Sequence, residues 1–273
     1  MTYKLGSDQF FHNSNAEGGG RATTGIVVSG GILNESEVRE VRSIGDWKPV
    51  VLREGMLRAT GSVNLMLQTE GILALAERDG NGHLTSFDIE GGIDDWSQIH
   101  HACKIDTLTL SADAGGELMG TLAWKGRYAE DGGGGGAHAP STNDVLMWYE
   151  GAAAGGNFAT QEIIGFTVNI SHNCDWVPLI DNSIDPKRSA KYIREGPQVV
   201  SANFRFLEHE NFDIAAECLA YIASATLTFT NTCDGSTITI TLTNLQRGTQ
   251  EMPITPDFVN MGATYSVQTF TVA

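Results

Sequence analysis

The run His100-His101-Ala102-Cys103 is the best candidate for metal binding in the sequence. Imidazole and thiolate are ligands that suit zinc. Neighbouring side chains of a strand point to opposite faces, however, which works against joint ligation, and no second cluster has ligand spacing. We therefore interpret the run as the polar start of a strand and predict no metal site.

A second candidate is Asp79-Gly80-Asn81-Gly82-His83, which has part of the spacing of a calcium-binding loop when Glu90 is taken as its twelfth residue. Leu84 stands where such a loop needs glycine, and we expect strands instead of helices on both sides. The stretch is therefore predicted to be a hairpin turn.

Other patterns associated with catalysis are missing from the sequence. The glycines at 132–136 precede no Lys-Ser/Thr pair and open no helix, so they do not form a phosphate-binding loop. No Gly-x-Ser-x-Gly occurs, and the carboxylates are scattered as on a solvated surface. We predict no enzyme activity and no cofactor, and we interpret the four cysteines as isolated buried thiols: Cys103, Cys174, Cys218 and Cys233.

Composition restricts the partners. The chain has 273 residues, of which 41% are hydrophobic and 18% charged, a globular composition. Its net charge of −16 argues against a surface that holds nucleic acid by neutralising phosphates. High acid with low lysine also fits a protein that works in concentrated salt. The N-terminus has no apolar signal region and no apolar run is long enough to cross a membrane, so we expect a soluble protein.

Alternating apolar and polar residues predict a mostly β chain with short helices. The clearest hairpin joins residues 103–111 to residues 118–125 through a glycine turn. Residues 69–78 have helical composition, with Thr69 as the expected N-cap. Further strands are expected at 26–33, 47–52, 56–67, 145–149, 165–170, 192–207, 226–229, 238–242 and 263–272, and a second helix at 211–221.

One tripeptide occurs twice, and its surroundings are repeated with it. The two copies are Arg53-Glu54-Gly55 and Arg194-Glu195-Gly196. Each follows a charged, turn-rich stretch and precedes an alternating strand and a helical segment. We interpret this as a duplication of one β-rich unit. The expected organisation is an arm at 1–24, a first unit at 25–151, a linker at 152–162 and a second unit at 163–273.

The run from Cys103-Lys104 through Ser111 to the Ala114-Gly115-Gly116 turn and Leu118 resembles the tail tube proteins of long-tailed bacterial and archaeal viruses. The exit Trp124-Lys125-Gly126-Arg127, the later Trp148-Tyr149-Glu150-Gly151, the strand Phe166-Thr167-Val168-Asn169-Ile170-Ser171 and the second Arg-Glu-Gly also fit that family. The resemblance extends over most of residues 25–273.

This resemblance implies a β-sandwich or half-barrel unit that contributes strands to a shared inner β-barrel. Stacked rings then form a hollow tube in the virion tail, assembled in the host cytoplasm, through which DNA passes into the host. Two units per chain imply trimeric rings with pseudo-sixfold symmetry. The partners are other copies of the chain and the proteins at the ends of the tube.

We expect an acidic lumen that repels DNA phosphates. The arm and the polar tips at 34–50 and 181–193 are expected to contact neighbouring rings. Both Arg-Glu-Gly copies are expected at turns, where the glycine eases the bend and the Arg and Glu are free to pair with a neighbour. The alternative function is a carbohydrate-binding or adhesive β-sandwich that uses Trp47, Trp96 and Trp176 as stacking platforms. A hydrolase with paired carboxylates is a third, weaker hypothesis.

Overall fold

The computed structural model describes residues 9–41, 48, 51–93, 96–132, 144–155, 163–178, 189–207, 221–251 and 260–273. Residues 211–220 of the predicted helix, the tips at 42–47 and 181–188 and most of the glycine loop lie outside the described residues, while Tyr221 begins β14. Within the described ranges, no helix has the length and apolar character needed to cross a membrane.

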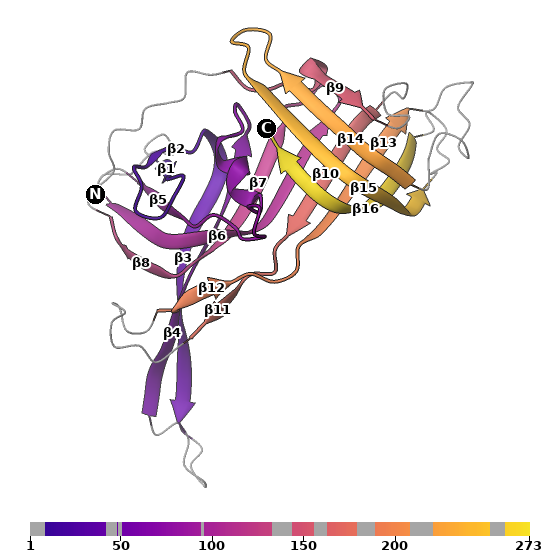
Figure 1. Cartoon of the computed structure of the whole chain (residues 1–273). Coiled ribbons are helices and arrows are strands. Elements are labelled where there is room, and N and C mark those ends of the chain that lie inside the picture. Colours follow the sequence, from indigo (N-terminus) through magenta and orange to yellow (C-terminus); the bar gives the residue numbers. More distant parts are fainter. Residues whose placement is uncertain are drawn as a thin grey trace.

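One antiparallel 14-stranded sheet dominates the chain and curls on itself as a half-barrel (Figure 1). A 2-stranded ribbon, β11 with β12, lies beside it. The strands are β1 Gln9–Asn13, β2 Ala22–Thr23, β3 Ile26–Val41, β4 Val51–Met66, β5 Phe87–Ile93, β6 Trp96–Asp113, β7 Met119–Gly126, β8 Tyr128–Asp131, β9 Gly151–Ala154, β10 Ile163–Ser171, β11 Asp175–Val177, β12 Tyr192–Arg194, β13 Val199–Leu207, β14 Tyr221–Thr230, β15 Thr237–Glu251 and β16 Asn260–Val272. Two 3-10 helices complete the described elements, η2 Gly71–Ala76 and η3 Trp148–Glu150.

The core lies inside the curl of the sheet. Buried side chains alternate along β6, β10, β13 and β15, as the period-2 pattern predicts. Phe166 on β10 and Phe229 on β14 lie on strands that are not neighbours in the sheet, yet their ring centroids are 5.8 Å apart. The curl therefore brings β14, near one end of the strand order, over β10 at its middle, and the two strands share a core in which each fully buried Phe contributes about 1.5–3 kcal/mol.

Most predicted strands are confirmed, and the hairpin of β6 with β7 has the expected partners. The tip predicted from residue 34 onward is instead strand, because β3 continues to Val41 and β4 begins at Val51, so that the two form one long hairpin extending from the body (Figure 1). Residues 145–149 are not a strand, since η3 begins at Trp148. Residues 151–154, expected next to or within a linker, form β9 and pair with β14.

The predicted helix at 69–78 is a 3-10 helix whose N-cap is Glu70, not Thr69. Four of its six residues are buried against the sheet, which explains why apolar composition indicated a helix there. The N-terminal stretch has a partner within its own chain, since β1 pairs with β5 along its whole length. Phe10 and Phe11 of this stretch are buried. Residues 9–13 are therefore part of the folded body.

The strand order repeats across the two halves of the chain. In the first half the order is β3-β4-β7-β6, and in the second it is β10-β13-β16-β15. In each half, the second strand of a first hairpin pairs with the last strand of a later hairpin: β4 pairs with β7, and β13 pairs with β16. β6 then joins the halves by pairing with β10. This order aligns β6 and β7 with β15 and β16, one strand later than the sequence match of residues 107–110 with 226–229.

Candidate assembly surfaces

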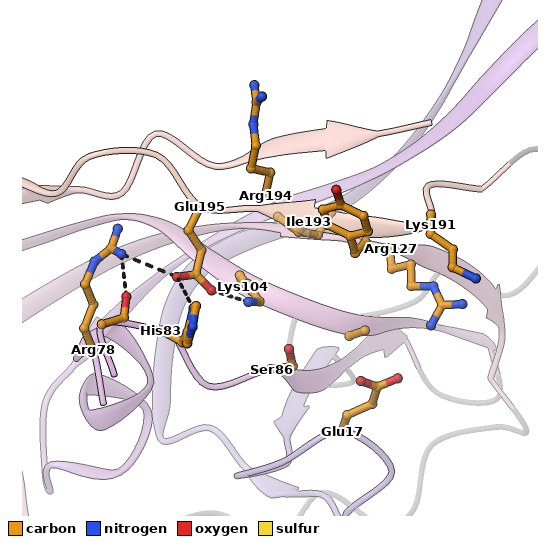
Figure 2. Close-up of a pocket in the computed structure, with 13 residues that line it drawn as sticks. Glu17, Arg78, His83, Ser86, Lys104, Arg127, Lys191, Ile193, Arg194 and Glu195 are labelled. Carbon is orange, nitrogen blue, oxygen red and sulfur yellow. Dashed lines mark hydrogen bonds and ion pairs between the residues drawn. The ribbon is translucent and has the colours of Figure 1, made fainter. Parts of the chain in front are cut away.

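The second Arg-Glu-Gly copy anchors the β11–β12 ribbon to the body of the protein. The Glu195 side chain is only 7% exposed and accepts from Lys104, while Arg78 Nη1 lies 3.4 Å and His83 Nδ1 3.8 Å from its Oε2 (Figure 2). Arg78 Nη2 also donates to the Gly196 carbonyl at 2.6 Å. A Cβ at Gly196 would lie 2.6 Å from a backbone oxygen of Asn173, so this glycine is required by close approach. The expectation that Glu195 is free to pair with a neighbour is wrong.

The first copy has a different position. Arg53, Glu54 and Gly55 lie within β4, and Arg53 and Glu54 pair across the hairpin with Arg39 and Val38 of β3. They do not form a turn, so the structural role expected from the matching tripeptide is wrong for this copy. The two tripeptides share letters but occupy different backbone environments.

A pocket of about 490 Å³ opens beside Glu195 (Figure 2). Its walls come from the ribbon and the residues next to it, the turn at 78–86, β6, the residue after β7 and the stretch after β1. Five Lys or Arg side chains and two glutamates line it, so that it is locally basic in an acidic chain. The basic residues are Arg78, Lys104, Arg127, Lys191 and Arg194. Sequence reasoning missed this pocket because its residues come from separate segments, with no local pattern to join them.

The face of the sheet turned away from the core carries a continuous row of uncharged polar side chains. The register places one such residue from each of β3, β4, β7, β6, β10, β13, β16 and β15 in a line, and none of them is buried. Thr109 Oγ1 donates to Asn169 Oδ1 at 2.8 Å, and Asn64 Nδ2 to Ser29 Oγ at 2.8 Å. The row is Ser29, Asn64, Thr121, Thr109, Asn169, Ser201, Ser266 and Gln246.

Charges next to this row are paired. Arg205 on β13 bonds to Asp113 on β6, and Lys125 Nζ lies 3.0 Å from Asp106 Oδ2. Lys125 also donates to a carbonyl at 2.6 Å. The net charge of −16 is thus not concentrated on the centre of this face, which is neutral and hydroxyl-rich. We call this surface the polar face.

The histidine and cysteine run divides between two environments. Neutral His100 is buried, with Trp124 Nε1 donating to its Nδ1 at 3.2 Å and Asn34 Oδ1 lying 2.8 Å from its Nε2. Burial, with the nearby charge of His101, lowers the pKa of His100 to about 4. Within the described part of the chain, no three His, Cys, Asp or Glu side chains converge as a metal site.

His101 lies between two carboxylates. Its Nδ1 is 3.3 Å from Asp88 Oδ2 and its Nε2 is 2.8 Å from Glu130 Oε1. Burial opposes the charged imidazolium, but the two carboxylates outweigh burial and raise the pKa of His101. Asp88 is itself buried, and it accepts from the backbone amides of Gly18 and Ala102, so that this charge is fully hydrogen-bonded. The cluster attaches the N-terminal stretch to β5 and β6.

The segment that resembled a calcium loop is a turn, as predicted. Asp79 Oδ1 accepts from the backbone amides of Asn81 and His83 at 2.9 and 2.8 Å, and Arg78 and Leu84 close the turn as an antiparallel bridge. Glu90, the expected twelfth residue, accepts from Ser97 instead. The carboxylates of this stretch therefore already bind protein groups.

Two of the three proposed carbohydrate platforms are described. Trp176 donates to the Gly126 carbonyl at 3.0 Å, and the Arg58 guanidinium carbon and Lys125 Nζ lie 5.5 and 5.1 Å from its ring centroid. These cations occupy the aromatic face that a sugar would need. Trp96 is 60% exposed, and Trp47 lies outside the described residues.

The cysteines differ in exposure. Cys103 and Cys174 are buried free thiols, as predicted, and burial raises the pKa of Cys174 to about 12. Cys233 is exposed, so the prediction of a buried thiol is wrong there. Cys218 lies outside the described residues.

Four strands in the described part of the sheet have one neighbour only, namely the short strands β2 and β8 and the strands β3 and β9. β3 pairs with β4 alone, and β9 pairs with β14 alone. Val28 and Leu33 on β3 are 53% and 51% exposed. An exposed edge with apolar side chains pairs readily with another chain. The fold is that of a mostly β protein with one large antiparallel sheet.

The family model described as phage tail tube protein matches residues 48–272, and the chain belongs to that family. A search of curated proteins found no match. The protein is a structural, non-enzymatic component of the phage tail tube and is located in the virion tail. Tail tube proteins polymerise with themselves.

Proposed function

We propose that the chain forms the wall of a hollow tube through which viral DNA passes into the host, and that the polar face lines the lumen. The observation that carries this proposal is the uncharged row from Ser29 to Gln246, which crosses both halves of the sheet. Such a row continues from chain to chain if the edges of neighbouring sheets pair.

The chemistry of the row suits passage of DNA without binding. Proteins hold DNA mainly by neutralising its phosphates with Lys and Arg, and each such contact strengthens binding. The Lys125 and Arg205 charges beside the row are neutralised by Asp106 and Asp113. Hydroxyl and amide groups keep the face hydrated without a fixed positive charge. In this proposal a neutral surface, in place of an acidic one, keeps DNA mobile.

We also propose that the chain is an internal duplication that assembles as trimeric rings with pseudo-sixfold symmetry. The repeated strand order of the two halves supports two units, one at 25–151 and one at 163–273. Three chains then supply six units per ring. The β6–β10 pairing within a chain has its counterpart between chains, where the β3 edge of one copy meets the β14–β9 end of the next.

Contacts between rings are proposed for three surfaces. These are the arm before residue 9, the end of the long β3–β4 hairpin that includes Arg53 and Glu54, and the stretch at 181–193. The hairpin extends well beyond the body of the protein (Figure 1), which supports contact with a neighbouring ring. Arg194, 67% exposed at the side chain, is the residue of the second triplet that remains accessible.

Electron microscopy of the purified full-length chain tests these proposals. We expect hollow tubes whose rings contain three chains each, with the polar face toward the lumen. Sixfold rings of whole chains would refute the stoichiometry, and a lumen lined by another face would refute the role of the polar row. Removal of residues 2–8, which leaves the buried Phe10 and Phe11 in place, tests the arm in the same images: tubes of unchanged length and number would exclude it.

A further inference from the structure

The basic pocket beside the ribbon has two electrostatically different ends. At one end, Glu195 accepts from Lys104 and forms an ion pair with Arg78, which neutralises much of the local charge. Arg127 and Lys191 lie on the other side of the pocket in Figure 2, away from Glu195. The backbones of these two regions are joined, since the Ala190 amide donates to the Arg127 carbonyl at 3.3 Å.

Two arginines of this pocket, Arg78 and Arg127, have a buried Nε without an acceptor, but the Nη groups of Arg78 bond to Gly82, Gly196 and Glu195. Arg127 is therefore the less satisfied of the two. Its Nε is out of contact with solvent and has no hydrogen-bond acceptor, and within the described ranges its guanidinium forms no ion pair. Its one described side-chain contact places the guanidinium carbon 5.8 Å from the Tyr128 ring centroid. A buried guanidinium donor without an acceptor is costly, and a carboxylate is the group that satisfies it in bidentate geometry.

We propose that this pocket binds a carboxylate-bearing segment of a second copy of the chain, with Arg127 as the principal donor. The inference rests on the proposed function, because it assigns a charge-complementary socket to the contact between copies in the tube. The pocket holds about 490 Å³, which accommodates an acidic side chain and its neighbours. Basic side chains outnumber the two glutamates in its lining, although one of them, Arg194, is paired with Asp175 on the ribbon.

A second copy is the favoured occupant because of the charge of the whole chain. Copies that each carry a net charge of −16 repel one another, and a basic pocket converts part of that repulsion into attraction at one defined place. Carboxylates are available: Glu35 on the projecting hairpin is exposed, and no ion pair involves it among the described residues. Duplex DNA is disfavoured because the same net charge repels its phosphates at every approach.

Substitution of Arg127 in the full-length chain is the first test. Arg127→Met keeps the volume but removes the donor, and Arg127→Glu reverses the charge. We expect both variants to raise the critical concentration for tube formation by at least about tenfold, whereas Arg127→Lys raises it less. The matched control is Arg205→Met, which removes an arginine that is already paired on the polar face. Thermal unfolding of the unassembled chains verifies that each variant is folded.

The result that would overturn the inference is an unchanged critical concentration for Arg127→Met in a chain whose wild type forms tubes. A loss of duplex DNA binding without a change in assembly would also overturn it, in favour of a phosphate site. If the wild type forms no tubes, the proposed function itself fails, so the two failures are distinguishable.

Chemical cross-linking provides a test that does not depend on a variant. Tubes assembled from mixed light and heavy isotope-labelled chains are treated with a carbodiimide, which joins amines to carboxylates in direct contact. We expect light–heavy cross-links from Lys191 to an Asp or Glu of another copy. Cross-links confined to one chain, such as Lys104 to Glu195, would contradict the proposal.

Discussion

Glu195→Ala removes the carboxylate that holds the ribbon on the body of the protein. Glu195 is 7% exposed at the side chain, and its partners Arg78 and Lys104 are 21% and 17% exposed, so the variant leaves two largely buried cations without their counter-ion. Breaking a buried pair costs about 3–5 kcal/mol, and the residual exposure of the cations places this variant near 3 kcal/mol. Arg78 retains its bonds to two carbonyls, which keeps the loss at this lower end.

Urea unfolding measures the loss. With a slope of roughly 3 kcal/mol per molar urea, the midpoint of Glu195→Ala is expected about 1 M below the wild type. Asp175→Asn is the matched control, because Asp175 pairs with Arg194 on the same ribbon at 3.5 Å but both side chains are at least 60% exposed. Such a surface pair contributes about 0–1 kcal/mol. Equal midpoints for the two variants would refute the assignment of Glu195 as the anchor.

Two further predictions concern the polar face and a buried histidine. Replacing Thr109, Asn169 and Ser201 together by lysine is expected to make tubes bind DNA roughly tenfold or more tighter at low salt, in a salt-dependent manner. A lysine at the exposed turn residue Asn81 is expected to leave DNA binding unchanged. Equal DNA retention by the two variants, measured by filter binding, would contradict the assignment of the polar face to the lumen. The pKa of His100 is lowered from 6.5 to about 4 in the folded protein, because the buried ring is held neutral. The unfolded chain therefore takes up a proton before the folded one does, and about 3 kcal/mol of the free energy of unfolding present above pH 6.5 is lost as the pH falls toward 4. Urea midpoints between pH 6.5 and 4 should therefore decline less in His100→Gln than in the wild type, and parallel declines would show that His100 is not responsible.

The sequence predicts the strands because their burial alternates with period 2, and it predicts the β6–β7 hairpin because a glycine turn joins two such runs. It fails where tertiary pairing overrides local polarity. Residues 34–41 are rich in charge, yet they continue β3 because β4 supplies hydrogen bonds along their whole length. The small residues at 151–154 resemble a linker, but they pair with β14 and form the edge strand β9.

The candidate surfaces are less accessible to sequence reasoning. The matching tripeptides predicted the same role for Glu54 and Glu195, but Glu54 lies within β4, whereas the carboxylate of Glu195 contacts Lys104 and Arg78. The pocket is formed by residues from both halves of the chain. From the sequence alone, Arg127 is predicted only as a residue after the end of a strand. The polar row depends on inter-strand register, which a one-residue shift would destroy and which single-strand patterns do not contain.

The pairing of β6 with β10 has a consequence for the kinetics of assembly. These strands contribute the seam between the two halves, and because they belong to one polypeptide, their encounter is unimolecular and independent of protein concentration. If the proposed ring forms, a chain that carries this seam internally needs fewer bimolecular collisions to close it than two separate halves would need. In that proposed ring, the covalent link also keeps the two halves in equal number.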